Sequence, residues 1–275
     1  MKLGVLQGRL QPPEDGHIQE FPTKWFAEFK LLKDLDLHCL EWIITKPSFA
    51  TNPILSINYN FATFPISSIC VDHIIDPQIQ ETKFLKENLE SVCEMAISNN
   101  VPCITIPLLE ESSMESPERR KQFGDAIESL AAEYPSLSFS FEAELGIPEL
   151  TEIVSRRDNF YVTYDTGNIT SYGLNHAEYV EKLAPKINNV HIKDRTFAAQ
   201  TVEPLTGDTD FKTIFKSLKN IDYQGPYILQ TARGEDGLEK QTIRKHKKIF
   251  EDLYAKTIYS YRQNCFYHRW CWLAW

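Results

Sequence analysis

Short apolar runs alternate with segments of helical periodicity along most of the chain. The runs are rich in β-branched and aromatic residues and end abruptly in polar side chains, which is typical of buried parallel strands. The expected strands cover residues 2–8, 39–44, 66–72, 103–109, 137–142, 160–165, 188–192 and 226–231. The expected helices cover residues 23–35, 80–99, 116–134, 147–155, 177–183, 210–219 and 238–255, with a short irregular helix at 53–59.

The helical segments carry recognisable faces and start signals. The clearest one, residues 80–99, has apolar residues at helical spacing. These are Leu85, Leu89, Val92 and Ala96. Ser116 followed by Pro117 predicts a capped helix start, and Thr23 is the expected N-cap of the first helix.

Eight strand-then-helix units in succession favour an α/β fold, the (β/α)8 TIM barrel. The competing architecture is an open doubly wound sheet. That sheet would normally carry a GxGxxG turn after its first strand, and Gly4 and Gly8 do not match this motif. No repeat, low-complexity tract or linker interrupts the pattern, so we expect a single barrel domain over residues 1–256.

An aromatic-rich C-terminal tail, residues 257–275, departs from the barrel pattern. It contains three of the five tryptophans, which lie within the last six residues. Packing on the barrel wall or base is the expected role. A self-association surface and a terminus foreign to the fold are the alternatives, since exposed aromatic patches usually mark contacts.

Composition narrows the class of protein. Hydrophobic residues make up 42% and charged residues 24% of the 275 residues, which is ordinary for a globular protein. The formal net charge of -9 argues against a nucleic-acid binder, because such proteins neutralise phosphates with Lys and Arg. The six cysteines form no CxxC pair, so we expect free thiols. The sequence shows neither a signal peptide nor a membrane span, and we expect a cytoplasmic protein.

Chemistry-bearing side chains recur where the expected strands end. The last four strands offer Glu142, Asp165, His191 and Gln230, each at the same relative position. The C-terminal ends of barrel strands share one mouth, so these side chains can converge. Two carboxylates, an imidazole and an amide oxygen suit a divalent ion such as Mn, Mg, Co or Zn.

Each of these residues also has a purely structural interpretation. Asp165 before Thr-Gly-Asn can be a turn or cap residue. A lone histidine such as His191 is more often a hydrogen-bonded core residue than a ligand, and Glu142 can simply pair with an arginine. The metal-site hypothesis therefore depends on the coincidence of all four positions.

The strand-end motifs resemble those of a known family. Ser-Phe-Glu142, Tyr-Asp165-Thr-Gly-Asn168, Val-His191-Ile-Lys193-Asp-Arg195 and Ile-Leu-Gln230-Thr-Ala-Arg233 are similar to the sugar phosphate isomerase/epimerase family of the xylose isomerase-like TIM-barrel superfamily. The segment from Leu6 to Leu10, the segment from Ile18 to Pro22 and Glu41-Trp42 resemble a branch associated with surface-polysaccharide sugars. The resemblance covers roughly residues 1–255.

The resemblance implies a ligand set with two departures. Many relatives bind a metal through Glu, Asp, His and Glu, and Glu142, Asp165 and His191 match the first three. Gln230 stands where the second Glu would be, and a neutral amide can ligate through oxygen but cannot act as a general base. Asn168 replaces a His found in some relatives. A simple two-glutamate epimerisation is therefore not expected.

The expected activity is a metal-assisted isomerisation or epimerisation of a sugar or sugar phosphate by proton abstraction next to a carbonyl. Glu142 is the expected base, and Lys193 or Glu41 is the expected second acid. The expected substrate-binding residues are Gln7, Arg9, Trp42, Asn168, Arg195 and Arg233. Salt bridges for the arginines and core packing for Trp42 are the alternatives.

Other functions stay open on the sequence. The same superfamily includes lyases or dehydratases and metal-dependent endonucleases, although the acidic charge disfavours the latter. Gln230 could instead mark a barrel that binds a sugar without turnover. Neither a nucleic acid nor a membrane is an expected partner, and homo-oligomerisation is left open.

Overall fold

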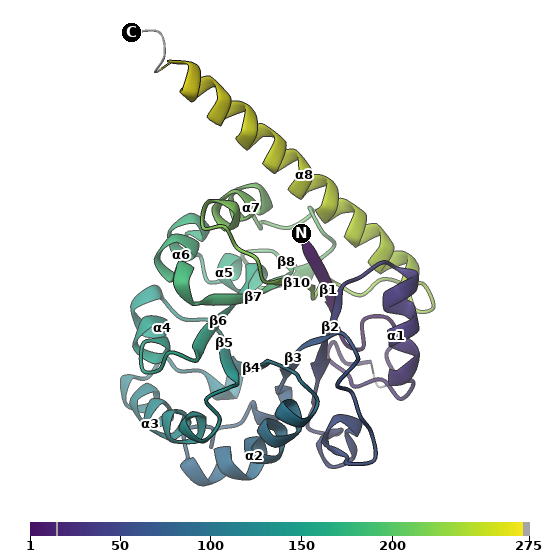
Figure 1. The fold of residues 1–275 in the computed structure, drawn as a ribbon, viewed down its shortest axis with the longest axis vertical. Helices are drawn as coiled ribbons and strands as arrows, with labels where there is room; N and C mark the ends of the chain where they lie inside the picture. Colours follow the sequence, from purple (N-terminus) through teal and green to yellow (C-terminus); the bar gives the residue numbers. More distant parts are fainter. Residues whose placement is uncertain (15, 272–275) are drawn as a thin grey trace.

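Eight parallel strands close into a barrel in this computed structural model, which describes residues 1–14 and 16–271 (Figure 1). The strand order around the barrel is β1-β10-β7-β6-β5-β4-β3-β2. The strands are β1 (Lys2–Leu6), β2 (Cys39–Ile43), β3 (Ile66–Cys70), β4 (Cys103–Leu108), β5 (Ser138–Ala143), β6 (Phe160–Asp165), β7 (Ile187–Ile192) and β10 (Pro226–Leu229). The predicted single-domain TIM barrel is thus confirmed.

Helices surround the barrel on its outside (Figure 1). They are α1 (Trp25–Asp34), α2 (Thr82–Ser98), α3 (Pro117–Glu133), α4 (Ile147–Val154), α5 (Thr166–Ser171), α6 (His176–Leu183), α7 (Phe211–Asn220) and α8 (Glu239–Cys271). Between β2 and β3 two short 3-10 helices, Phe49–Thr51 and Pro53–Leu55, replace a full helix. The sequence pattern missed α5 and a two-stranded hairpin of β8 (Asp194–Arg195) and β9 (Thr201–Val202), since both are too short to show periodicity.

Alternation along each strand divides the side chains between two cores. On β2, Leu40 and Trp42 point outward into the large core between barrel and helices. Cys39 and Ile43 point inward, where they pack in a small apolar cluster inside the barrel. The residue between them, Glu41, shares the inward parity, so β2 delivers a carboxylate to the barrel interior.

The helix boundaries follow local chemistry, with two corrections. Ser116 accepts a hydrogen bond from the backbone N–H of Arg119, which confirms it as the N-cap of α3. The prediction of Thr23 as N-cap of α1 is wrong, because Lys24 occupies that position without a side-chain cap. Thr23 donates its hydroxyl to Glu14 instead.

The last helix does not end near residue 255 as predicted. It continues to Cys271, so the expected boundary between residues 256 and 257 falls inside α8, whose C-terminal part extends beyond the barrel (Figure 1). The expected contacts of the tail fall mainly on side chains from Ser260 onward, which lie outside the described residues. Within the part that is described, no helix combines the length and the apolar character needed to cross a membrane.

The loop after β1 is fastened from two sides. Gly8 adopts a φ of +85°, and its N–H donates to the buried carboxylate of Glu28 on α1 at 3.0 Å. Arg233, which follows β10, donates from Nη1 to the carbonyls of Gly8 (3.0 Å) and Gln11 (3.2 Å). The loop therefore holds a defined position at the C-terminal ends of the strands.

Candidate metal centre

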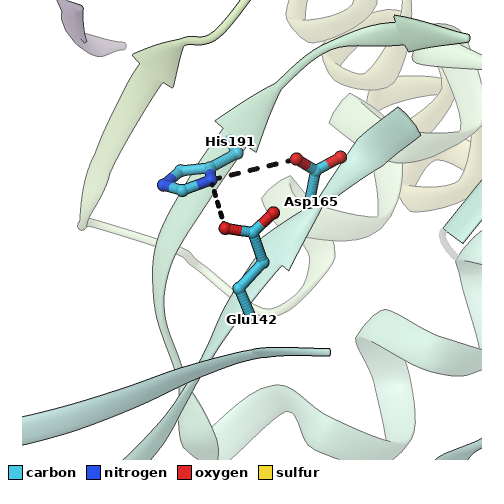
Figure 2. Close-up of side chains that lie close together, drawn as sticks. All are labelled: Glu142, Asp165 and His191. Carbon is cyan, nitrogen blue, oxygen red and sulfur yellow. Dashed lines mark ion pairs between the residues drawn. The ribbon is translucent and has the colours of Figure 1, made fainter. Parts of the chain in front are cut away.

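Three side chains from consecutive strands meet at the C-terminal end of the barrel. Glu142 (β5), Asp165 (β6) and His191 (β7) each place a ligand atom within 4.8 Å of the others. Nδ1 of His191 lies 3.2 Å from Oε2 of Glu142 and 3.9 Å from Oδ2 of Asp165 (Figure 2). All three side chains are buried, at 3%, 2% and 0% relative exposure in that order.

The Asp-Thr-Gly-Asn segment gives Asp165 two tasks. Its Oδ1 caps α5 by accepting the N–H of Asn168 at 2.8 Å. Its Oδ2 faces the cluster and lies 2.8 Å from the ammonium of Lys193. The structural interpretation as a cap and the hypothesis of a ligand are therefore compatible, because each uses a different oxygen.

Asn168 and Lys193 follow Asp165 and His191 closely in the chain, and each contacts a carboxylate of the cluster. The Asn168 amide donates to Oε1 of Glu142 at 2.9 Å, so it orients that carboxylate. Burial raises the pKa of Asp165, but Lys193 and His191 outweigh this effect and hold it below its usual range. An ionised Asp165 is the form required of a metal ligand.

The far side of His191 contacts a third carboxylate. Its Nε2 lies 2.6 Å from Oε2 of Glu41, which is 0% exposed. Burial lowers the pKa of His191, yet Glu41 and Glu142 outweigh it and raise the pKa well above its usual range. In the absence of a cation, these carboxylates therefore favour an imidazolium at this position.

Glu41 lies below the cluster and not at the mouth. Its Oε1 accepts hydrogen bonds from Ser68 and Asn189, and both residues line a cavity of about 370 Å³ at the N-terminal ends of the strands. Asn189 precedes His191 by two residues on β7 and shares its inward parity. The prediction of Glu41 as a second catalytic acid is therefore wrong, because His191 separates it from the mouth.

The donor set fits a divalent cation. Nδ1 of His191, Oδ2 of Asp165 and Oε1 of Gln230 are buried and have no hydrogen-bond partner among the described residues. The ammonium of Lys193 forms an ion pair with Oδ2 of Asp165 at 2.8 Å. Two carboxylates and one imidazole match the ligands of Zn, Mn or Co, with oxygen-preferring Mg also accommodated.

Gln230 has the position expected of a fourth strand-end residue. On β10, Ile228 pairs with His191 and packs inside the barrel. Gln230 lies two residues further and shares this inward parity, one layer closer to the mouth. Its role as a metal ligand stays a prediction.

The three arginines predicted to bind substrate differ in the hydrogen bonds that they form with neighbouring groups. Arg195 donates from Nη1 to Glu144 at 3.2 Å, and Arg233 binds backbone carbonyls of the β1–α1 loop. Arg9 is buried and donates to Gln19 at 3.3 Å. The Nε atoms of Arg9 and Arg195 have no partner within the described ranges, so their role in substrate binding stays a prediction.

The two remaining candidates, Trp42 and Gln7, are both buried. Trp42 is 0% exposed, points out of the barrel and donates its Nε1–H to Asn52 at 2.9 Å. The prediction that it stacks on a sugar is therefore wrong, and the alternative of core packing holds. Gln7 is 1% exposed, and its Oε1 accepts the N–H of Ile43 at 3.1 Å.

An open cavity of about 900 Å³ lies on the mouth side of the barrel. It is lined by segments that follow β1, β2, β3 and β4, including Trp25, Thr45, Asp72 and Glu110. Burial raises the pKa of Asp72 to about 6, and the charge of Glu142 is the next cause.

The layer beneath His191 went unrecognised in the sequence. It consists of polar side chains that point into the barrel from different strands and bind Glu41, namely Ser68, Thr105 and Asn189. The alternation of inward and outward side chains along each strand is the signal that could have identified these residues. Asn189 is two residues from His191, and Ser68 is directly paired with Glu41 across β2 and β3.

Comparisons with known proteins agree with the barrel fold. The family model described as xylose isomerase-like TIM barrel matches residues 58–252. No curated protein matches the chain.

Solved structures with the same fold include three of particular interest. An L-ribulose 3-epimerase superposes with a TM-score of 0.72 at 12% identity, covering 95% of this chain and 97% of that one. The IolI protein, solved with a bound zinc atom, superposes with a TM-score of 0.71 at 18% identity, covering 94% of this chain and 99% of that one. The 3-keto-D-glucoside 4-epimerase from E. coli superposes with a TM-score of 0.64 at 18% identity, covering 92% of this chain and 99% of that one. These superpositions show a common fold. The family model covers more than half of the chain, and the chain therefore belongs to the xylose isomerase-like TIM barrel family.

Proposed function

We propose that this protein is a metal-dependent isomerase or epimerase that moves a proton on the carbon next to the carbonyl of a sugar. The observation that carries the proposal is the convergence of Glu142, Asp165 and His191 within 4.8 Å at the mouth of the barrel. A divalent ion held there would polarise a sugar carbonyl or hydroxyl and acidify the neighbouring C–H.

The side chains around the cluster have complementary roles in this reaction. Glu142 is the base, because its carboxylate is buried at the mouth and is oriented by Asn168. Lys193 is the acid that returns a proton, since its ammonium lies 2.8 Å from Asp165 and next to the same centre. Gln230 contributes an amide oxygen and cannot exchange the proton itself.

The substrate we propose is an unphosphorylated sugar. The cavity on the mouth side is lined by carboxyl-bearing residues, namely Glu14, Glu20, Asp72, Glu110 and Glu111. Lys46 is the single Lys or Arg among its lining residues within the described part of the chain. A phosphate would meet net negative charge there, whereas sugar hydroxyls can donate to carboxylates.

The names of structural relatives support the same class of reaction. Enzymes named L-ribulose 3-epimerase and 3-keto-D-glucoside 4-epimerase share the fold over nearly their whole length. The zinc atom in the IolI structure supports a metal centre in a barrel of this kind. The transfer of these properties to this chain is part of the proposal.

Solvent exchange tests the proposal directly. Purified protein loaded with Mn²⁺ or Zn²⁺ is incubated in deuterated buffer with a panel of ketoses, aldoses and their phosphate esters, and exchange at the carbon next to the carbonyl is followed by NMR. We expect exchange with at least one free sugar, weaker exchange with its phosphate ester, and none after chelation or in His191→Ala. Metal binding without exchange on any sugar would contradict the enzymatic role, and faster exchange on the phosphate ester would contradict the substrate class.

A further inference from the structure

We propose that Glu41 is a positioning residue that keeps the proton of His191 on Nε2 and thereby presents the lone pair of Nδ1 to the metal. The inference rests on the proposed metal centre. It concerns a residue that touches neither the ion nor the substrate.

The two oxygens of Glu41 have different surroundings. Oε1 accepts hydrogen bonds from Ser68 Oγ (2.8 Å), Thr105 Oγ1 (2.8 Å) and Asn189 Nδ2 (2.9 Å). Oε2 lies 2.6 Å from Nε2 of His191. These partners come from β3, β4 and β7, so three strands of the closed barrel hold the carboxylate in place.

The types of these donors determine where the charge resides. An amide nitrogen such as that of Asn189 can only donate, and the two hydroxyls complete a set of three donors on one oxygen. Three donors on Oε1 stabilise the ionised carboxylate over the neutral acid. Oε2 is therefore the acceptor in its contact with His191.

The close approach of Oε2 to Nε2 favours a proton on Nε2. An unprotonated ring nitrogen at 2.6 Å from a carboxylate oxygen would oppose two lone pairs. The Asn189 amide also approaches Nε2, at 3.3 Å, but it is closer to Oε1 of Glu41, at 2.9 Å. We therefore assign the proton to Nε2, which faces a charged oxygen at 2.6 Å.

The opposite ring nitrogen is then left for the cation. Nδ1 faces Glu142 and Asp165, while Nε2 points away from both (Figure 2). A neutral imidazole with the proton on Nε2 carries its lone pair on Nδ1, on the side of the two carboxylates. Partners of this kind on the second nitrogen of a ligating histidine fix the ring and raise its basicity.

Buried charge supports the same assignment. Glu41, Glu142 and Asp165 contribute three negative charges, and Lys193 contributes one positive charge. A divalent ion with a neutral His191 would balance this group. An aliphatic residue at position 41 would avoid the free-energy cost of burying a carboxylate, so we assign the carboxylate to the metal centre and not to barrel packing.

Metal affinity and the state of the imidazole test the inference together. The variants are Glu41→Gln, Glu41→Leu and Glu28→Gln, the last being a matched control that changes another fully buried glutamate outside the metal centre. Zn²⁺ affinity is measured by competition with a chelator, and the ring nitrogens of His191 are observed by ¹⁵N NMR in the zinc-loaded protein.

We expect Glu41→Leu to weaken zinc binding by about 10- to 100-fold. Glu41→Gln should weaken zinc binding less, because its amide oxygen can still accept a hydrogen bond from Nε2. Wild-type zinc protein should show a protonated Nε2 and a metal-bound Nδ1, and Glu41→Leu should lose this single form. Glu28→Gln should bind zinc as the wild type does.

The outcomes separate this inference from the proposed function. If the wild type binds no divalent ion, the metal centre itself is wrong, and the inference fails with it. If the wild type binds zinc and both Glu41 variants bind equally well, or if zinc occupies Nε2, only the role of Glu41 is overturned. If Glu41→Leu fails to fold, the zinc affinity of Glu41→Gln and the ¹⁵N NMR signals of His191 in the wild type still test the role of Glu41.

Discussion

At the scale of single residues, different atoms of one side chain make different contacts. Asp165 uses one oxygen to cap α5 and turns the other to the cluster. His191 turns Nδ1 toward Glu142 and Asp165 and Nε2 toward Glu41. Because each polar atom has a separate direction, a capping role and a chemical role can coexist in one side chain.

Gln230 is the residue whose replacement should change the centre most informatively. Gln230→Glu adds a carboxylate at an inward position near the mouth, where Oε1 has no hydrogen-bond partner among the described residues. We expect divalent-ion affinity to rise by about tenfold or more, because an added negative charge attracts the cation in a buried site. Titration calorimetry with Mn²⁺ measures the change. A fall in affinity would show that the amide is not a ligand or that the position requires a neutral group.

At the scale of elements, the loop after β1 is fastened by side chains from other parts of the barrel. Arg233 after β10 and Glu28 on α1 both bind the loop that follows β1. Two of the predicted substrate contacts, Arg195 and Arg233, are partly engaged in such fastening. The sequence could identify these arginines as strand-end residues, but only the positions of the loops show which carbonyls and carboxylates they meet.

Gly8 should be the least replaceable residue of the β1–α1 loop. A Cβ at Gly8 would collide with the carbonyl oxygen of Glu20, and the φ of +85° already disfavours an L side chain. Gly237 has nearly the same φ, +84°, with open space around it, and serves as the control. We expect Gly237→Ala to cost about 1 kcal/mol in free energy of unfolding and Gly8→Ala roughly 2–4 kcal/mol, measured by urea unfolding. Equal losses would show that the loop can shift away from Glu20.

At the scale of the whole molecule, closure of the barrel brings together residues that are distant in the chain. Glu41 on β2 and His191 on β7 are separated by β1 and β10 in the closed strand order and meet through the interior. An ordinary barrel fills this space with branched apolar side chains. Here a polar layer occupies part of it, in which Oε1 of Glu41 accepts hydrogen bonds from Ser68, Thr105 and Asn189.

The pH dependence of stability should contain a contribution from Glu28. Burial raises the pKa of Glu28 to about 8 from an ordinary value of 4.5. Between these values the unfolded chain has lost the proton that the folded protein retains, so stability falls as pH rises and levels off above about 8. The loss is at most roughly 5 kcal/mol.

Urea unfolding of the wild type and Glu28→Gln at pH 5, 7 and 8.5 isolates this contribution. The variant does not titrate at this position, so other groups affect both proteins equally. We expect the wild type to lose stability relative to the variant as pH rises from 5 to 8.5. Parallel pH profiles would mean that Glu28 is ionised in the fold, with its N–H donors compensating for burial.

The sequence by itself determined the strand-and-helix order, the barrel and the strand-end positions of Glu142, Asp165 and His191. These features follow from local periodicity and from the rule that parallel strands end at a common face. Short elements such as α5 escaped because they carry too few residues for a period.

Only the tertiary structure decided which atoms face each other across the closed barrel. It turned Trp42 outward, placed Glu41 behind His191 and engaged Arg233 with the first loop. These outcomes depend on register and closure, which bring strands into contact at separations that no local pattern records. Residue types could therefore indicate the chemistry, while the partners that orient each group came from the three-dimensional fold.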